Sequence, residues 1–273
     1  MKTAIITGAS AGLGLEFVRQ IKDHFPEIEC YWLLARNPGR EPLPQIPGVE
    51  LRPMAVNLTT PESIAQLQEA LAAEQPQVEL LIGCAGCGYL GNFDESDPEE
   101  QLRMVSLNVS GLTAVTHAVL PYMPNGSRII NISSIASFVP TARMTIYSAT
   151  KAYVSAFSRG LHTELKPRNI SVTAVCPGPM DTEFIRAGRI KGQSKTFDIL
   201  PYCIPMKVVK GALKAAKKGV PSTRLCFSTK STGCWPPSSP MPFLFTLQKH
   251  KQNPGKSGVL LIPMSSRGRR GKP

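Results

Sequence analysis

The chain opens with the stretch MKTAIITGASAGLGLEF at residues 1–17. A short β-branched and apolar run, Lys2–Thr7, leads into a glycine-rich turn, and helical spacing follows from Gly12. Glycines let the backbone approach a pyrophosphate, and the first turn of a helix offers free N–H groups and a partial positive charge. The spacing is G-x-x-x-G-x-G instead of the usual dinucleotide fingerprint G-x-G-x-x-G. On its own, this turn is therefore equally well interpreted as a plain tight turn.

The alternation of strand and helix signals continues to about residue 218. Further apolar runs lie at 30–35, 50–57, 78–85, 128–132 and 171–176, and helical patterns start near residues 61, 98, 147 and 206. Strands separated by helices of this length are typical of βαβ units and a parallel sheet. We therefore expect one α/β domain over residues 1–219, a Rossmann-type doubly wound parallel sheet with strand order 3-2-1-4-5-6.

Composition supports a globular protein. Hydrophobic residues make up 42% of the 273 residues and charged residues 18%, which excludes collagen-like, coiled-coil and wholly disordered chains. We expect no membrane span, because no uninterrupted apolar run reaches about 18 residues. The start of the chain shows no signal-peptide pattern, so the expected location is cytoplasmic. The seven cysteines are odd in number and scattered, which favours reduced thiols.

The net charge of +12 is concentrated near the end of the chain. Residues 1–200 hold 17 Lys and Arg and all 19 Asp and Glu, whereas residues 201–273 hold the other 14 basic residues and no acid. Residues 221–273 also contain 8 Pro and 8 Ser. We interpret 220–273 as a basic tail, disordered or aberrant. The tail has three alternative interpretations: a site for nucleic acid or anionic lipid, a flexible solvated end, or the product of a changed reading frame. Since RNA-binding motifs are absent, we expect no nucleic-acid partner.

The end of the second strand points to the cofactor. An acid there would bind the 2′-hydroxyl of an adenosine ribose, but this chain has Ala35-Arg36-Asn37. A guanidinium suits a 2′-phosphate, which favours NADP(H) over NAD. The alternative is that Arg36 is a solvated residue at a strand end.

The stretch Tyr147-Ser-Ala-Thr-Lys151 carries the acid–base signal. Residues four apart share one face of a helix, so the Lys151 ammonium would lie beside the Tyr147 phenol. Service as an acid or base near pH 7 needs a shift of roughly 3 units from the tyrosine reference pKa of about 10. A neighbouring cation and an oxidised nicotinamide would supply that shift. Ser134 follows the fifth strand, thirteen positions before Tyr147.

Residues 1 to about 218 resemble the classical short-chain dehydrogenase/reductase family, and within it the bacterial general reductases of the DltE type. The resemblance rests on motifs that occur in the family's order and spacing: TGASAGLG (7–14), CAG (84–86), LNV (107–109), ISS (132–134), YSATK (147–151) and PGPMDT (177–182).

The resemblance implies a role for each catalytic residue. Tyr147 would protonate the carbonyl oxygen, and Ser134 would orient the substrate through the same oxygen. Lys151 would lower the Tyr147 pKa and bind the nicotinamide ribose, and Asn108 would hold a water in a proton relay. The expected cofactor-binding set is Gly8, Ser10, Gly12, Leu13, Gly14, Arg36, Asn57, Leu58, Ala85, Gly86, Asn108, Tyr147, Lys151, Pro177, Gly178 and Thr182.

These residues predict an NADP(H)-dependent oxidoreductase that interconverts a ketone or aldehyde and an alcohol. The alternative is a non-catalytic dinucleotide-binding relative with a degenerate C-terminus. The substrate is expected to be a small hydrophobic molecule, because apolar residues occupy the predicted lid at 179–200: Met180, Phe184, Ile185, Ile190 and Phe197. A homodimer would pair through the helices at 98–123 and 147–165. No metal site is expected, since Cys84-x-x-Cys87 lacks a second pair.

Three departures from the family pattern stand out. The usual Asn-Asn-Ala-Gly is Gly83-Cys84-Ala85-Gly86 in this chain, so an asparagine that braces the sheet is lost. Asn57 replaces the adenine-binding acid, although its side-chain carbonyl is also an acceptor. After Gly219 we expect the family's seventh strand to be missing.

Overall fold

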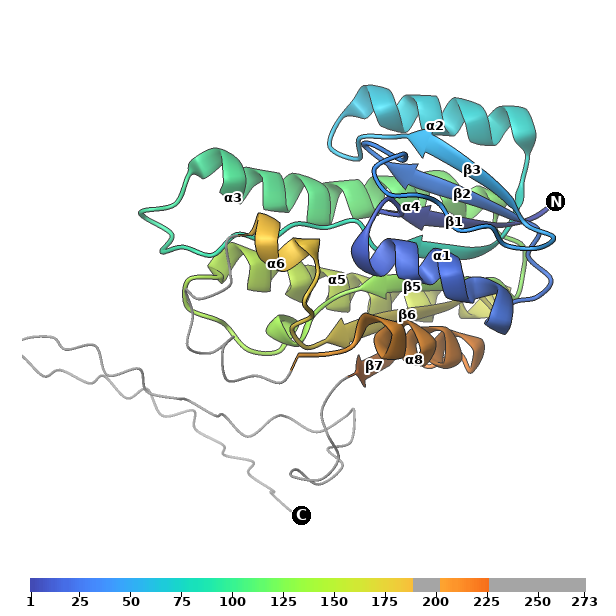
Figure 1. Cartoon of the computed structure of the whole chain (residues 1–273). Coiled ribbons are helices and arrows are strands. Elements are labelled where there is room, and N and C mark those ends of the chain that lie inside the picture. Colours follow the sequence, from blue (N-terminus) through green and yellow to red (C-terminus); the bar gives the residue numbers. More distant parts are fainter. Residues whose placement is uncertain (189–201, 226–273) are drawn as a thin grey trace, which may run out of the picture. The chain divides into compact units, whose positions relative to one another are not determined.

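The computed structural model describes residues 1–188 and 202–225 (Figure 1). All of them lie in one compact unit, Met1–Pro237. The predicted lid residues from 189 to 200, including Ile190 and Phe197, and the predicted tail from residue 226 onward lie outside the described residues.

A seven-stranded parallel sheet forms the centre of this unit, in the order β3-β2-β1-β4-β5-β6-β7. The first six strands confirm the predicted α/β Rossmann-type sheet and its strand order. Their bounds are β1 Lys2–Thr7, β2 Cys30–Ala35, β3 Glu50–Ala55, β4 Gln77–Gly83, β5 Arg128–Ile132 and β6 Ser171–Pro177. Strand β1 pairs with both β2 and β4, so the strand order reverses direction between β1 and β4.

The expectation that the seventh strand is missing is wrong. Residues Ser222–Leu225 form β7, which pairs in parallel with β6 from Ala174↔Ser222 to Pro177↔Leu225. Gly219 makes this return possible, because it adopts φ +66° at the end of the preceding helix. The Val220 carbonyl then accepts a hydrogen bond from Thr173 Oγ1 at 2.7 Å. Regular structure therefore extends beyond the predicted boundary at residue 219.

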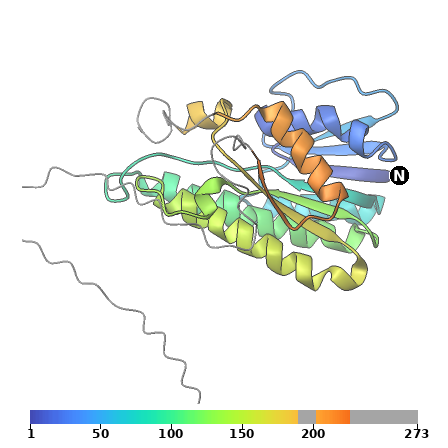
Figure 2. The same cartoon turned by 90° about the horizontal axis from the view of Figure 1, so that it is seen from below.

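Helices cover both faces of the sheet (Figures 1 and 2). Helices α1 (Gly12–His24) and α8 (Pro205–Lys217) pack on one face, and α2 (Pro61–Glu74), α4 (Leu112–Val119) and α5 (Thr145–Glu164) on the other. Both faces are therefore apolar: Ile6 and Leu33 face α1, whereas Ile5 and Trp32 face α2 and α4. The remaining elements are α3 Pro98–Val105, η1 Ser106–Gly111, η2 Leu120–Tyr122, η3 Ile135–Ser137, η4 Lys166–Arg168 and α6 Glu183–Ala187.

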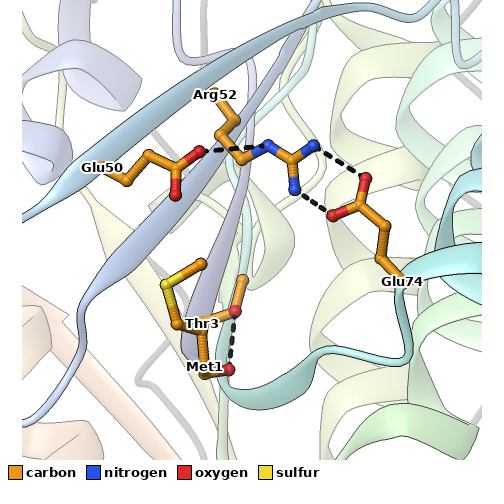
Figure 3. A network of polar contacts seen from close by, with 5 residues as sticks. All are labelled: Met1, Thr3, Glu50, Arg52 and Glu74. Atoms are coloured by element: carbon orange, nitrogen blue, oxygen red, sulfur yellow. Dashed lines mark hydrogen bonds and ion pairs between the residues drawn. The ribbon is translucent and has the colours of Figure 1, made fainter.

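Strand β3 is one edge of the sheet, and Arg52 ties it to the end of α2 (Figure 3). The Arg52 guanidinium donates two hydrogen bonds to the Glu74 carboxylate, one of them at 2.8 Å, and lies 3.6 Å from Glu50. It also lies over the Trp32 ring, 5.3 Å from the centroid. This network holds the edge strand β3 against the C-terminal end of α2, away from the predicted site.

One helical stretch in the described part of the chain, Pro98–Tyr122, is long and apolar enough by composition to cross a membrane. It comprises α3, η1, α4 and η2, and 44% of its most apolar window is buried inside the fold. Because a core helix passes the same test, this stretch is weak evidence for a span.

Candidate active site

The predicted site residues gather at one edge of the sheet. The glycine-rich turn follows β1, Arg36 follows β2, Asn57 follows β3, Gly86 follows β4 and Ser134 follows β5. The stretch 177–182 completes the set at the end of β6. Because the strands are parallel, all six connections meet at the carboxyl edge, beside the point where the strand order reverses. In open α/β sheets this is the place where ligands bind.

The glycine-rich turn between β1 and α1 is closely packed backbone. A Cβ added at Gly14 would lie 2.1 Å from the Gly8 carbonyl oxygen, and one at Gly8 would lie 2.9 Å from Ala85 Cα. Gly8 and Gly12 also adopt φ values of +67° and +54°, which side chains rarely allow. Only glycine fits at these positions, so the turn brings the start of α1 close to the end of β4.

Thr7 holds this arrangement together, although sequence analysis gave it no role. Its Oγ1 accepts hydrogen bonds from the backbone N–H groups of Cys84 at 3.0 Å and Ala85 at 3.1 Å, and it donates to the Ile82 carbonyl at 3.3 Å. The position of Thr7 directly before the first glycine of the motif is the sequence signal that could have indicated this role. Thr7 therefore fixes the loop that contains the predicted cofactor residues Ala85 and Gly86.

Tyr147 and Ser134 meet at the centre of the site. Tyr147 lies in the first turn of α5 and Ser134 two residues after the end of β5, and both are buried. Burial raises the pKa of Tyr147 to about 12, while a hydrogen bond with the Ser134 side chain acts in the opposite direction. Lys151 is not among the causes of this shift, so its expected effect on the tyrosine stays a prediction. The phenol is therefore protonated at neutral pH and able to donate.

Lys151 lies one helical turn after Tyr147 and is also buried. Its Nζ lies 5.7 Å from the centroid of the Tyr147 ring and donates to the Ile132 carbonyl at 2.9 Å. Burial lowers the Lys151 pKa to about 8, although three nearby cysteines act to raise it. At neutral pH, the lysine therefore carries a positive charge that it loses just above neutrality.

Asn108 acts as a clamp between three elements. It lies in the π-helical turn η1, and its Nδ2 donates to the Cys87 carbonyl at 2.8 Å and to Thr150 Oγ1 at 3.1 Å. Its Oδ1 accepts from the Cys87 N–H at 2.9 Å. A Cβ on Gly86 would lie 3.2 Å from Asn108 Oδ1 and 3.4 Å from Lys151 Nζ, so both polar groups border the same space. π-Helical turns of this kind often mark functional sites.

The residues predicted to bind the adenosine half differ in their availability. Arg36 is exposed at the end of β2. Asn57 Oδ1 already accepts two hydrogen bonds from Thr59, one from its backbone N–H at 3.2 Å and one from its side-chain hydroxyl at 2.8 Å. The Leu58 side chain is buried in the core, and its backbone packs against Gly111. Leu58 therefore exposes little of its side chain to a cofactor.

The stretch after β6 lies opposite the glycine-rich turn. A Cβ on Gly12 would lie 3.8 Å from Thr182 Cβ, which brings these two predicted cofactor residues together. Phe184 of α6 contacts Tyr147, with ring centroids 5.4 Å apart. An apolar cluster surrounds Tyr147, and its members are Met104, Met144, Ile185, Cys87, Tyr89, Leu90, Ala136, Ile146 and Phe184.

The described cysteines give no metal site. Cys30, Cys84, Cys87 and Cys176 are free thiols, whereas Cys203 is disulfide-bonded, contrary to the expectation of reduced thiols throughout. Burial raises the pKa of the Cys84 thiol to about 12, so it is neutral near pH 7. Among residues 1–188 and 202–225, no group of three or more His, Cys, Asp or Glu side chains is placed to hold a metal.

A family model for short chain dehydrogenases matches residues 2–191. The chain belongs to the short-chain dehydrogenase family. An uncharacterized oxidoreductase of Staphylococcus saprophyticus is 31% identical over 188 residues, which cover 66% of this chain and 79% of that protein. The predicted family and its oxidoreductase class are therefore confirmed.

Solved structures of short-chain dehydrogenases resemble this fold. One from Sphingobium yanoikuyae, in complex with NADPH, has a TM-score of 0.68 and 28% identity, covering 82% of this chain and 87% of that one. The bulky-bulky ketone specific alcohol dehydrogenase from Comamonas testosteroni has a TM-score of 0.66 and 27% identity, covering 82% and 86%.

Proposed function

We propose that this short-chain dehydrogenase is an NADP(H)-dependent reductase that interconverts a ketone or aldehyde and an alcohol. The observation that carries the proposal is that Ser134, Tyr147 and Lys151 lie together at the carboxyl edge of the sheet. They lie next to the glycine-rich turn of Gly8, Gly12 and Gly14, which we call the glycine cradle. A protonated phenol, a hydroxyl and a buried ammonium together suit proton transfer to a carbonyl oxygen. The DltE-type subgroup stays a prediction.

The cradle fits a dinucleotide. Gly8, Gly12 and Gly14 leave no side chain between the backbone and a pyrophosphate, and the start of α1 supplies N–H groups. Gly86 leaves space beside Lys151 Nζ, where a ribose hydroxyl would accept a hydrogen bond. Arg36 suits a 2′-phosphate, which favours NADP(H) over NAD. A bound NADPH would supply the hydride for the reduction.

Each catalytic side chain has a task in proton transfer. The Tyr147 hydroxyl donates its proton to the substrate oxygen, and the Ser134 hydroxyl donates a hydrogen bond to the same oxygen and orients it. The Lys151 ammonium stabilises the tyrosinate that remains. Asn108 keeps the loop after β4 in place beside Lys151. Its side-chain groups are bonded to Cys87 and Thr150, so the proposed relay water would bind elsewhere than Asn108 Nδ2.

The apolar cluster around Tyr147 supports a hydrophobic substrate. Phe184, Ile185 and Met144 would face the carbon skeleton next to the carbonyl. The similarity to an alcohol dehydrogenase specific for bulky ketones supports the same choice.

Substitution of Tyr147 by Phe tests the proposal. This variant keeps the ring and its contact with Phe184 but loses the proton donor, so turnover of a hydrophobic ketone with NADPH should fall about 10²- to 10⁴-fold. The NADPH dissociation constant should change little, which isothermal titration calorimetry would measure. Unchanged turnover would refute the role of Tyr147. A wild-type chain that binds NADPH but reduces no carbonyl compound would instead support the non-catalytic alternative.

We also propose that the chain forms a homodimer through α3, α4 and α5. Leu102 and Val105 are 66% and 38% exposed, and with Val109 they continue one helical stripe. The stripe leads into a hollow of about 590 Å³ between α2, α4 and α5, lined in part by Val109 and Tyr153. A second copy would cover these apolar side chains.

The cytoplasmic location stays a prediction.

A further inference from the structure

The outer face of α8 carries a dense group of positive charges. Lys207, Lys210, Lys214 and Lys217 follow the spacing i, i+3, i+7 and i+10, so they lie on one side of the helix, and Lys218 extends the group. All five side chains are exposed. We call these five residues the lysine face. In Figure 2, α8 runs along the outside of the fold beside α1.

The lysine face has little compensating negative charge. No acid occurs in residues 201–273, and none of the ion pairs in the described part of the chain includes these lysines. On the neighbouring helix α1, Glu16 is paired with Arg19, and Asp23 is the remaining acid. Burial and three lysines of the face lower the pKa of His24, although Asp23 opposes them. The positive potential therefore reaches α1.

Exposed apolar side chains stand directly before the lysine face. Tyr202, Ile204 and Met206 are 38%, 50% and 57% exposed, and we call them the apolar tip. The tip is held in place, because the Cys203 N–H donates to the Pro179 carbonyl at 2.7 Å and Gln20 Nε2 donates to the Met206 carbonyl at 3.1 Å. The first of these bonds ties the tip to the stretch that borders the candidate active site.

We propose that the lysine face and the apolar tip bind the surface of an anionic phospholipid membrane. Lysine ammonium groups are attracted to anionic headgroups, with about a 5-fold gain in binding for each lysine at the surface. Exposed apolar side chains beside the lysines would enter the boundary between headgroups and acyl chains. This apolar component favours a bilayer over nucleic acid, whose backbone offers only charge to such a face. The inference does not depend on the proposed reaction.

The test measures binding of the full chain to vesicles of phosphatidylglycerol and phosphatidylcholine by co-sedimentation. The double variant Lys210→Gln/Lys214→Gln should bind about 25-fold more weakly than wild type, from the same 5-fold per lysine. The control Lys2→Gln/Lys166→Gln removes the same charge from other exposed positions and should bind within about 2-fold of wild type, because these lysines lie outside the face. Vesicles of pure phosphatidylcholine should bind weakly.

A second pair of variants tests the apolar tip. Ile204→Ser/Met206→Ser should weaken vesicle binding at least about 5-fold, whereas Phe93→Ser/Val139→Ser, at other exposed apolar positions, should not. Neither pair should change binding to single-stranded RNA. The proposal is overturned if the Lys210/Lys214 variant binds vesicles as tightly as its control. It is also overturned if the loss of Ile204 and Met206 has no effect, because the face would then bind polyanions in general.

Discussion

Lys151 should set the pH dependence of cofactor use at the scale of single residues. Burial lowers its pKa to about 8, so the ammonium is present below pH 8 and is lost as the pH rises. Tyr147, with a pKa of about 12, stays protonated over the same range. We therefore expect kcat/KM for NADPH to fall above pH 8 in a pH–rate profile. Lys151→Arg keeps its charge and should remove this decline; a wild-type profile that stays flat to pH 10 would contradict the assignment.

Arg36 should decide between the two nicotinamide cofactors. A charge-assisted contact with a 2′-phosphate contributes about 1.5–3 kcal/mol, so Arg36→Ser should weaken NADPH binding roughly 10- to 100-fold. NADH binding should stay the same, since NADH lacks the phosphate, and it serves as the internal control. Thermal unfolding with each cofactor measures both effects. Equal losses for NADPH and NADH would show that Arg36 is only a solvated residue at a strand end.

At this scale, the sequence predicted which residues lie together better than it predicted the contacts that hold them. Tyr147 and Lys151 were predicted from their types and spacing, and Ser134 from the resemblance to the family; the structure brings the three together. The burial that raises the pKa of Tyr147 was not foreseen, because it depends on side chains that are distant in sequence. The effect of a glycine at position 83 also depends on residues that are distant in sequence. A Cβ at that position would lie 2.7 Å from Asn131 Oδ1, so the neighbouring strand fills the space that the family's asparagine would take.

At the scale of elements, the turn between β1 and α1 should tolerate no added atom at Gly14. Gly14→Ala places a methyl group against the Gly8 carbonyl, which cannot yield, and should lower the free energy of unfolding by about 3 kcal/mol or more. Gly160→Ala is the matched control within α5, where nothing lies within 4 Å of an added Cβ. Helix propensity predicts that this control gains about 0.5–1 kcal/mol. Denaturant unfolding of both variants would show the contrast, and equal stability would contradict it.

Elements with strong periodicity were predicted well, and short or irregular ones were not. Strand β7 has four residues and follows a stretch rich in lysine, so no pattern of alternation marks it. The π-helical turn Ser106–Gly111 was predicted as part of one continuous helix, because a single i→i+5 turn inside an α-helix has no sequence signature of its own. Both elements depend on tertiary contacts, with β6 in one case and with Cys87 and Thr150 in the other.

At the scale of the whole molecule, self-association should depend on the apolar stripe of α3. Wild type should sediment with the mass of two protomers, and Leu102→Glu should shift it to one, because a charge would be buried in the proposed interface. Ile204→Glu is the control, since it places the same charge at an exposed apolar residue on another surface. A wild-type chain that sediments as a monomer would refute the dimer.

The sheet order has a consequence for damage to the chain. Strand β1, the first in sequence, lies between β2 and β4, whereas β7, the last described strand, has a single partner. Loss of residues 2–7 would divide the sheet in two and remove the glycine cradle's support. Loss of β7 would expose only one side of β6. A chain that lost β7 would therefore keep the six strands whose ends carry the candidate site, whereas a chain that lost β1 would not.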